Sequence, residues 1–333
     1  MTVQVYEHGR RLALAAAATS VHWIGEEALF ALGDGTVLIA SRQGDPRRVT
    51  AHDGAILSAA LHPDGKRLIT GGDDGRLNAI APSGEIETLV ELRKWVDHVA
   101  TSAVSGIIVA AVGKQAIVFR EHAEAHRFTY ASTLGGLALD AKGRRLAASH
   151  YGGATLRYAL MADDKGVTLP WTGSHLAVTL SPDADYVVTA MQENSLHGWR
   201  LPEKTDLRMD GYPAKTRGFS WDKRGRWLAT SGADSAIVWP FVGKLGPQGK
   251  PPLQLGQREA LVSAVAFHPT EDLLAIGYAD GAATLARFSD AAVLDLDEPG
   301  EAAVTTLAWR QDGRQLALGD AAGRGALIDF TST

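Results

Sequence analysis

The sequence predicts an all-β protein built by repetition of one sheet unit, and three observations support this. A shift of 40 residues superposes the sequence on itself without gaps, so that 21–40 lies over 61–80 and then over 101–120. Apolar segments within each copy are short and are separated by Asp-Gly or Pro-Asp-Gly turns, which is the pattern of β-hairpins. The 3.6-residue spacing of an amphipathic helix is missing from these segments.

Eight copies of the unit can be aligned along the chain. They span 309 − 21 = 288 residues in seven steps, so each step is about 41 residues long. A period of about 40–45 residues is typical of the four-stranded blade of a β-propeller. We therefore predict an all-β β-propeller of eight four-stranded antiparallel blades, with seven blades as the alternative. The copies begin at Val21, Leu61, Thr101, Leu139, Leu180, Trp221, Phe267 and Trp309.

Each copy predicts four strands in the same order. In the second copy the first strand is expected at Ala55–Leu61, the second at Arg67–Thr70, and the third after the Asp-Gly turn. The fourth, outer strand falls in the linker between copies. Its expected positions are Arg47–Thr50, Ile86–Glu91, Val167–Trp171 and Val293–Asp297.

The last copy ends at Phe330 and leaves no residues for its own outer strand. An open sheet end would expose unpaired backbone groups, so we expect the ring of blades to close. The N-terminal segment, either Val3–Tyr6 or Arg10–Leu14, is expected to pair with the C-terminal blade and supply the missing strand. This arrangement predicts one propeller domain over residues 1–333.

Composition excludes several classes of protein. The net charge is −5 and 45% of the residues are hydrophobic, so the chain can bury a core and binding of nucleic acid is unlikely. The absence of Cys excludes disulfides and thiolate chemistry. No apolar run is long enough to span a membrane. We expect a monomer when no partner is bound.

One feature bears on location. Arg10-Arg11 followed by the apolar segment 12–20 resembles a short secretory signal with small residues at a cleavage point. Cleavage there would remove the predicted closing strand. We therefore predict a cytoplasmic protein, with export as the alternative.

The segments LHPDGKRLITGGDDGRL (61–77) and WDKRGRWLATSGADSAIVW (221–239) resemble the WD-repeat (Trp-Asp repeat) β-propeller family. In that family a His, a Ser or Thr, a turn Asp and a Trp form a structural hydrogen-bonded tetrad. The resemblance implies this role for two incomplete sets of residues in the present chain. The second copy keeps His52, Thr70 and Asp74, and the sixth keeps Thr230, Asp234 and Trp239 without a matching His.

No arrangement of residues indicates catalysis. The chain lacks a phosphate-binding Gly-rich loop, a nucleophile elbow and a His-Glu-x-x-His motif. The adjacent carboxylates Asp73-Asp74 and Asp163-Asp164 are interpreted as turn formers. We therefore predict no catalytic residues and no cofactor. A propeller hydrolase or lyase that draws polar residues into the channel remains an alternative.

Three histidines share one repeat position directly after the innermost strand. His22, His62 and His268 could form an arc at the mouth of the channel. Neighbouring blades are about 10 Å or more apart, which is too wide for metal–nitrogen bonds of about 2 Å. We therefore predict no metal. A small-molecule or metal-binding propeller that uses the channel and this arc is the alternative function.

The loops that enter the innermost strands are rich in aromatic and basic residues. Such residues dominate the energetics of protein interfaces, and loops on rigid scaffolds commonly carry binding sites. The sequence therefore predicts a non-enzymatic scaffold or adaptor that binds a protein partner through this rim, with the basic residues selecting an acidic partner. The family resemblance implies the same kind of role. For Trp95, Trp171 and Tyr212, packing between blades is the alternative. The rim residues are His52, Arg93, Lys94, Trp95, Tyr130, Trp171, Tyr212, Lys215, Arg217 and Arg258.

Overall fold

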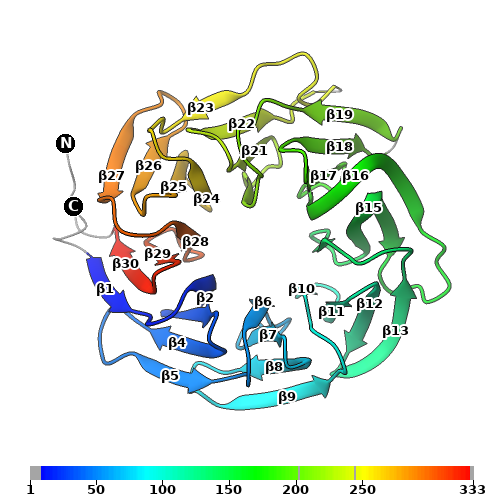
Figure 1. The fold of residues 1–333 in the computed structure, drawn as a ribbon, viewed down its shortest axis with the longest axis horizontal. Coiled ribbons are helices and arrows are strands. Elements are labelled where there is room, and N and C mark those ends of the chain that lie inside the picture. Colours follow the sequence, from blue (N-terminus) through cyan, green and yellow to red (C-terminus); the bar gives the residue numbers. More distant parts are fainter. Residues whose placement is uncertain (1–8, 202, 244, 331–333) are drawn as a thin grey trace. The chain divides into compact units, whose positions relative to one another are not determined.

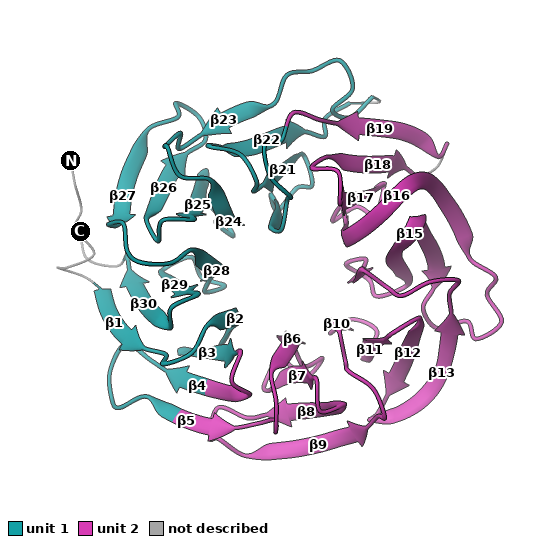
Figure 2. Ribbon diagram, viewed as in Figure 1, with its two compact units in different colours: residues 1–32, 38–47, 212–333 teal, residues 33–37, 48–211 magenta. Residues whose placement is uncertain are grey.

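The computed structural model describes residues 9–201, 203–243 and 245–330, and every regular element in these ranges is a β-strand (Figure 1). Within the same ranges no helix is long and apolar enough to cross a membrane. The expected closing segment Val3–Tyr6 lies outside the described residues. Contacts divide the chain into two compact units: unit 1 comprises 1–32, 38–47 and 212–333, and unit 2 comprises 33–37 and 48–211 (Figure 2).

The sheets are antiparallel, and most contain four consecutive strands in chain order. A short apolar segment, a tight turn and a second apolar segment produce each hairpin. In unit 2 one sheet is β6 (Ile56–Leu61), β7 (Leu68–Gly72), β8 (Arg76–Ile80) and β9 (Ile86–Glu91); the next is β10 (His98–Ser102), β11 (Ile107–Val112), β12 (Gln115–Arg120) and β13 (Ala123–Thr129).

The remaining sheet of unit 2 has six strands: β14 (Gly136–Leu139), β15 (Arg145–Tyr158), β16 (Val167–Leu180), β17 (Tyr186–Met191), β18 (Leu196–Arg200) and β19 (Thr205–Met209). A four-stranded sheet at the start of the chain consists of β2 (Ala18–Ile24), β3 (Glu27–Leu32), β4 (Thr36–Ala40) and β5 (Arg47–Thr50).

Unit 1 contains three further four-stranded sheets. The first is β20 (Phe219–Trp221), β21 (Trp227–Thr230), β22 (Ala236–Pro240) and β23 (Leu253–Leu255); the second is β24 (Val262–Phe267), β25 (Leu273–Tyr278), β26 (Ala283–Arg287) and β27 (Val293–Asp297). The third has the order β1-β30-β29-β28, with β1 at Gly9–Ala13, β28 at Val304–Trp309, β29 at Gln315–Asp320 and β30 at Arg324–Asp329.

The structure thus shows four-stranded antiparallel blades, as predicted, but seven sheets rather than eight. The prediction of eight separate blades is corrected at one place, the six-stranded sheet, which holds the fourth and fifth sequence repeats. There β15 and β16 are each 14 residues long. The first half of β16 pairs with β15, and the second half continues without a break and pairs with β17. The backbone N–H of Ala159 also donates to the carbonyl of Arg144, which closes a hairpin within β15.

The prediction that the N-terminal segment completes the C-terminal sheet is confirmed. Strand β1 pairs with β30 in antiparallel register, from Gly9 opposite Ile328 to Ala13 opposite Arg324. The residues involved are shifted by one from the expected Arg10–Leu14. Leu12 and Leu14 are buried against Ala317 and Leu327 in one apolar cluster. The strand is therefore held by packing as well as by its ladder.

Neighbouring sheets within a unit are joined by a recurring contact. The N–H of Val99 in β10 donates to Ser58 Oγ in β6, and the N–H of Phe267 in β24 donates to Ser220 Oγ in β20. Tryptophan makes a second such contact, because Trp309 Nε1 donates to the carbonyl of Ala266 in the preceding sheet. These bonds satisfy polar groups where first strands from successive sheets approach each other.

The second strand of a sequence repeat forms the core. All six residues of β11, β17 and β29 are buried, because these sheets pack with both faces against neighbours. The fourth strands β5 and β9 are mostly exposed. Their exposure explains why they carry charged residues and why the apolar pattern is weakest there.

Candidate functional site

A buried hydrogen-bonded group lies at the entry to β6. His52 Nδ1 is 2.9 Å from Asp74 Oδ1, and its Nε2 is 2.8 Å from Thr70 Oγ1. With Asp74 ionised, the Nδ1–H of His52 donates to Asp74 and the hydroxyl of Thr70 donates to Nε2. The structure thus brings together His52, Thr70 and Asp74, the three residues that the family resemblance implies for a tetrad-like group. The group fixes the loop before β6 onto the β7–β8 turn.

This group has the order hydroxyl, imidazole and carboxylate that is found in hydrolytic triads. Thr70 is 0% exposed and His52 is 2% exposed, so a substrate cannot reach the hydroxyl. Burial alone would raise the pKa of Asp74, but the N–H of Arg76, the His52 ring and the N–H of Asp53 bind its carboxylate and hold the pKa below its usual value. The arrangement stabilises a turn.

In the sixth repeat a tyrosine occupies the place of the missing histidine. The Tyr212 hydroxyl is 2.6 Å from Thr230 Oγ1 and accepts a hydrogen bond of 2.7 Å from Trp239 Nε1. Tyr212 precedes Thr230 by 18 residues, as His52 precedes Thr70 by 18. Asp234 does not join this group; its Oδ2 lies 3.3 Å from Gln257 Nε2. Burial raises the pKa of Tyr212 to about 12.

Two further aromatic residues of the predicted rim are packed into the fold. Tyr130 is buried in an apolar cluster, and burial raises the pKa of its hydroxyl to about 12. Trp171 stacks on His197 with ring centroids 3.9 Å apart. With His52 and Tyr212, four rim residues therefore make structural contacts.

The remaining rim residues lie nearer the surface. Arg258 pairs with Asp295 at 3.3 Å and its guanidinium lies over the ring of Tyr278. Arg93, Lys94 and Arg217 are exposed and Lys215 is half-buried, and among the described residues none of these four has an ion-pair partner. Trp95 is the rim aromatic that is left at the surface, with 61% of its area exposed.

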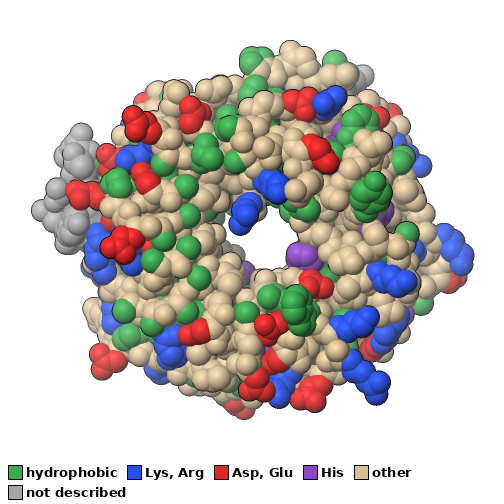
Figure 3. Space-filling view, viewed as in Figure 1, with side chains coloured by type: hydrophobic (Ala, Val, Ile, Leu, Met, Phe, Trp, Pro, Cys, Tyr) green, Lys and Arg blue, Asp and Glu red, His purple; other side chains and the backbone are tan. Residues whose placement is uncertain are grey.

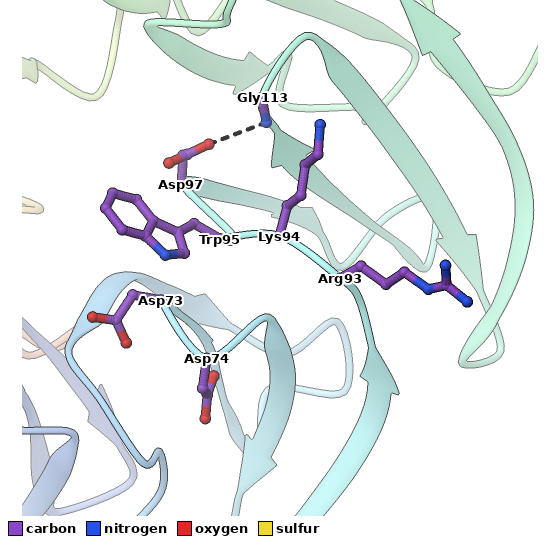
Figure 4. A pocket seen from close by; sticks show the side chains of 7 residues that line it. All are labelled: Asp73, Asp74, Arg93, Lys94, Trp95, Asp97 and Gly113. Carbon is purple, nitrogen blue, oxygen red and sulfur yellow. Dashed lines mark hydrogen bonds between the residues drawn. The ribbon is translucent and has the colours of Figure 1, made fainter.

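Trp95 lies at a pocket of about 420 Å³ within unit 2. The pocket is lined by Asp73, Asp74, Arg93, Lys94, Trp95, Asp97 and Gly113. Figure 4 shows the indole between the carboxylates of Asp73 and Asp97, whereas the side chains of Lys94 and Arg93 point away from them. In the space-filling view, hydrophobic and acidic side chains lie beside one another over this part of unit 2 (Figure 3).

The sequence did not indicate that carboxylates form part of this site. The sequence pattern indicates turn formers at Asp73 and Asp74 and gives no signal at Asp97. The available signal was their position, because an Asp-Gly turn lies at the same end of a sheet as the loops that enter the first strands. Asp74 does shape its turn, through the N–H of Arg76. The Asp73 side chain instead lines the pocket.

Backbone bonds hold the segment around Trp95 in place. The N–H of Leu92 donates to the carbonyl of Gly75, and the N–H of Val96 donates to the carbonyl of Gly72. Val96 is fully buried. Gly75 has φ +80°, and a Cβ there would lie 2.2 Å from the carbonyl oxygen of Leu92. A glycine is therefore needed where the β7–β8 turn meets this segment.

Two of the three histidines of the alternative metal hypothesis, His62 and His268, have other contacts. His62 Nε2 lies 3.2 Å from Nε2 of His122, and its Nδ1 lies near Asp64. His268 Nδ1 accepts from the N–H of Glu271. Across the described ranges, no group of three or more His, Asp or Glu side chains is arranged to hold a metal ion.

Consecutive antiparallel meanders, most of them four-stranded and with largely buried second strands, define the β-propeller class. Within that class two segments of the chain match family models of WD repeats. Residues 44–78 match the family described as WD domain, G-beta repeat, and residues 265–333 match the anaphase-promoting complex subunit 4 WD40 domain. The resemblance seen in the sequence is thus confirmed.

The fold is also similar to a solved structure. The crystal structure of the computationally designed Ika8 protein matches with a TM-score of 0.77 at 16% sequence identity, covering 95% of this chain and 97% of that chain. No curated protein matches the chain in sequence. In all, 1855 chains of solved structures match, and a fold shared so widely does not by itself assign a function.

Proposed function

We propose that the protein is a non-enzymatic scaffold or adaptor that binds a protein partner through the surface around Trp95. This Trp95 surface consists of Asp73, Arg93, Lys94, Trp95 and Asp97. The observation that carries the proposal is the exposure of 61% of Trp95 at a pocket, in a structure whose described residues include only two other exposed aromatics, Tyr151 and Tyr158. The WD-repeat fold supports the scaffold role. We propose the cytoplasm as its location.

The energetics of an exposed tryptophan favour a binding role. A Trp side chain buries about 150–250 Å² in an interface, and burial of apolar area contributes about 25 cal/mol per Å². Covering the exposed part of Trp95 would thus contribute about 3 kcal/mol to partner binding. Tryptophan is among the residues most enriched at the energetic centres of interfaces.

The rigidity of the segment adds to this. Hydrogen bonds from Leu92 and Val96 to the β7–β8 turn hold the backbone on both sides of Trp95. A partner therefore does not have to order the loop, and less conformational entropy is lost on binding. In unit 1, the exposed Arg217 and the half-buried Lys215 flank the buried Thr216, and we propose them as additional contacts.

The experiment compares affinity purifications of the wild-type chain and of W95A. Because Trp95 packs little, W95A should fold and should lose the specific partner. The matched control is V104A: Val104 is 74% exposed and follows β10, whereas Trp95 precedes it, so the control lies at the opposite end of the same strand. Retention of every specific partner by W95A at wild-type levels would contradict the proposal. The same holds if V104A loses as much of the partner as W95A does.

A further inference from the structure

The charges around Trp95 are unbalanced in a way that indicates a ligand. Asp73 and Asp97 lie on either side of the indole (Figure 4). Within the described part of the chain, neither carboxylate forms an ion pair with Lys or Arg. Asp97 Oδ2 accepts one weak bond of 3.2 Å from the N–H of Gly113. Both carboxylates therefore keep lone pairs that can accept hydrogen bonds from another molecule.

The nearest cations do not neutralise these carboxylates. Arg93 and Lys94 belong to the same loop, yet their side chains extend away from Asp73 and Asp97 (Figure 4). Arg76 does bind carboxylates, but its guanidinium lies 2.9 Å from Asp53 and 3.2 Å from Glu91. Arg93 and Lys94 line the pocket as well, but the space directly beside the indole is bordered by the two carboxylates (Figure 4).

The ring itself favours the same kind of ligand. The face of an indole carries negative electrostatic potential and attracts a cation placed over it, more strongly than the rings of Tyr or Phe do. The carboxylates of Asp73 and Asp97 add to that attraction. Together with the indole they favour a positive charge in the space beside the ring. An anionic group in the same place would be repelled by Asp73, Asp97 and the ring.

We propose that this pocket receives a lysine or arginine side chain of the protein partner. Its alkyl stem would lie along the indole, and its charged head would donate hydrogen bonds to Asp73 and Asp97. This inference rests on the adaptor role proposed above and names the chemistry of its central contact. It differs from the acidic partner that the basic rim residues suggest.

The test is a selection of displayed random short peptides on the immobilised full-length chain, at low and at physiological salt. Lys and Arg should be enriched about fivefold or more over the input library, and the enrichment should fall at the higher salt concentration. Peptides that carry a single Lys or Arg are then resynthesised. Each is compared with its Gln and acetyl-lysine versions by fluorescence anisotropy, which also separates lysine from arginine recognition.

Variants assign the effect to the pocket. D73N/D97N should weaken binding of the selected peptides about tenfold, whereas E259Q, which removes an exposed carboxylate in unit 1, should have no effect. W95F should retain part of the affinity and W95L little, because only an aromatic face attracts a cation. Equal binding to W95F and W95L would show an apolar contact and would overturn the inference.

The outcomes separate this inference from the adaptor proposal. Peptides enriched in Asp or Glu, or peptides that bind D73N/D97N as well as the wild type, would overturn the inference but leave the adaptor role in place if W95A weakens them. If the selected peptides bind W95A at wild-type affinity, both proposals fail for this surface. Circular dichroism of each variant shows whether a loss of binding comes from a loss of fold.

Discussion

The indole N–H of Trp239 donates a hydrogen bond to the hydroxyl of Tyr212 across 2.7 Å, and the same hydroxyl lies 2.6 Å from Thr230 Oγ1. Thr230 in turn donates to the carbonyl of Ile237. The chain of bonds therefore runs from the loop before β20 through β21 to β22. A phenol performs here the task that an imidazole, His52, performs in the second repeat.

Replacing Tyr212 by phenylalanine should destabilise the fold. The variant Y212F leaves the N–H of Trp239 buried without its acceptor, which costs about 1–3 kcal/mol. Urea denaturation followed by circular dichroism measures the loss. The control is Y151F. Tyr151 is 70% exposed, so removal of its hydroxyl leaves no buried polar group without a partner. Equal midpoints for the two variants would show that the Tyr212 network contributes nothing measurable.

Gly75 should be required for the position of the Trp95 segment. In G75A the new Cβ meets the carbonyl oxygen of Leu92 at 2.2 Å, so the backbone must shift. The matched control is G106A, which has a similar positive φ of +70° and no atom within 4 Å of the added Cβ. Both variants carry the strain of a left-handed residue, about 1 kcal/mol. Only G75A should lower the free energy of unfolding, measured by urea denaturation, by more than this strain. It should also weaken partner binding.

Stability should fall at acidic pH through His175. Burial lowers the pKa of His175 from 6.5 to about 4, against a raising effect of the Trp171 carbonyl and with smaller lowering effects of His197 and His150. As the pH falls, His175 binds a proton in the unfolded chain before it does so in the folded chain. The contribution of neutral His175 to stability is therefore complete above pH 6.5 and is lost between pH 6.5 and 4. The loss is about 1.4 kcal/mol per pH unit. Urea denaturation at pH 7 and pH 5 measures it.

The comparison variant is H175Q, in which the amide can still donate to Thr189 Oγ1, the atom 2.7 Å from Nδ1 in the wild type. Between pH 6.5 and 4 its unfolding should take up one proton fewer than that of the wild type, so its stability should fall less steeply as the pH falls. Other histidines with lowered pKa values, such as His62 and His98, contribute equally to both proteins. Parallel pH profiles for H175Q and the wild type would refute the assignment.

Truncation of Leu12 tests the importance of the N-terminal strand. Leu12 is buried on β1 against the apolar cluster that includes Leu327 of β30. L12A should lower the free energy of unfolding by about 2–4 kcal/mol. Its neighbour Ala13 is exposed on the same strand, so A13S is the control and should change stability by less than about 0.5 kcal/mol. An L12A midpoint equal to that of A13S would mean that β1 is not part of the cooperative fold.

The strand order could be predicted because it depends on local patterns. Turns such as Asp73-Asp74-Gly75 set the hairpins, and their period sets the unit, so strands β5, β9 and β27 were placed at their observed bounds. The continuity of β15 and β16 could not be predicted. It depends on whether the ladder of β15 and β16, which includes the pair Tyr151–Ser174, runs on into the pairing of β16 with β17, and the apolar pattern does not report that.

The site was predicted only in part, because residue type does not determine exposure. Tyr212 and Trp95 both lie in loops before a first strand. The hydroxyl of Tyr212 reaches Thr230, whereas the indole of Trp95 remains exposed to solvent. The 18-residue register shared with His52 and Thr70 could have identified Tyr212 as structural. The role of Asp73 required the fold, since its turn and the Trp95 segment are far enough apart in sequence that only the β7–β9 hairpins bring them together.

The pairing of β1 with β30 also determines how the protein responds to tension. Gly9 lies opposite Ile328 and Ala13 opposite Arg324, so the outward-leading ends of both strands leave the ladder at the same end. A load applied between Gly9 and Ile328 would act across the strands, along hydrogen bonds that run perpendicular to them. The bonds would then break one pair after another, as in a zipper, and the sheet that joins the two extremities would be the first to peel open under force.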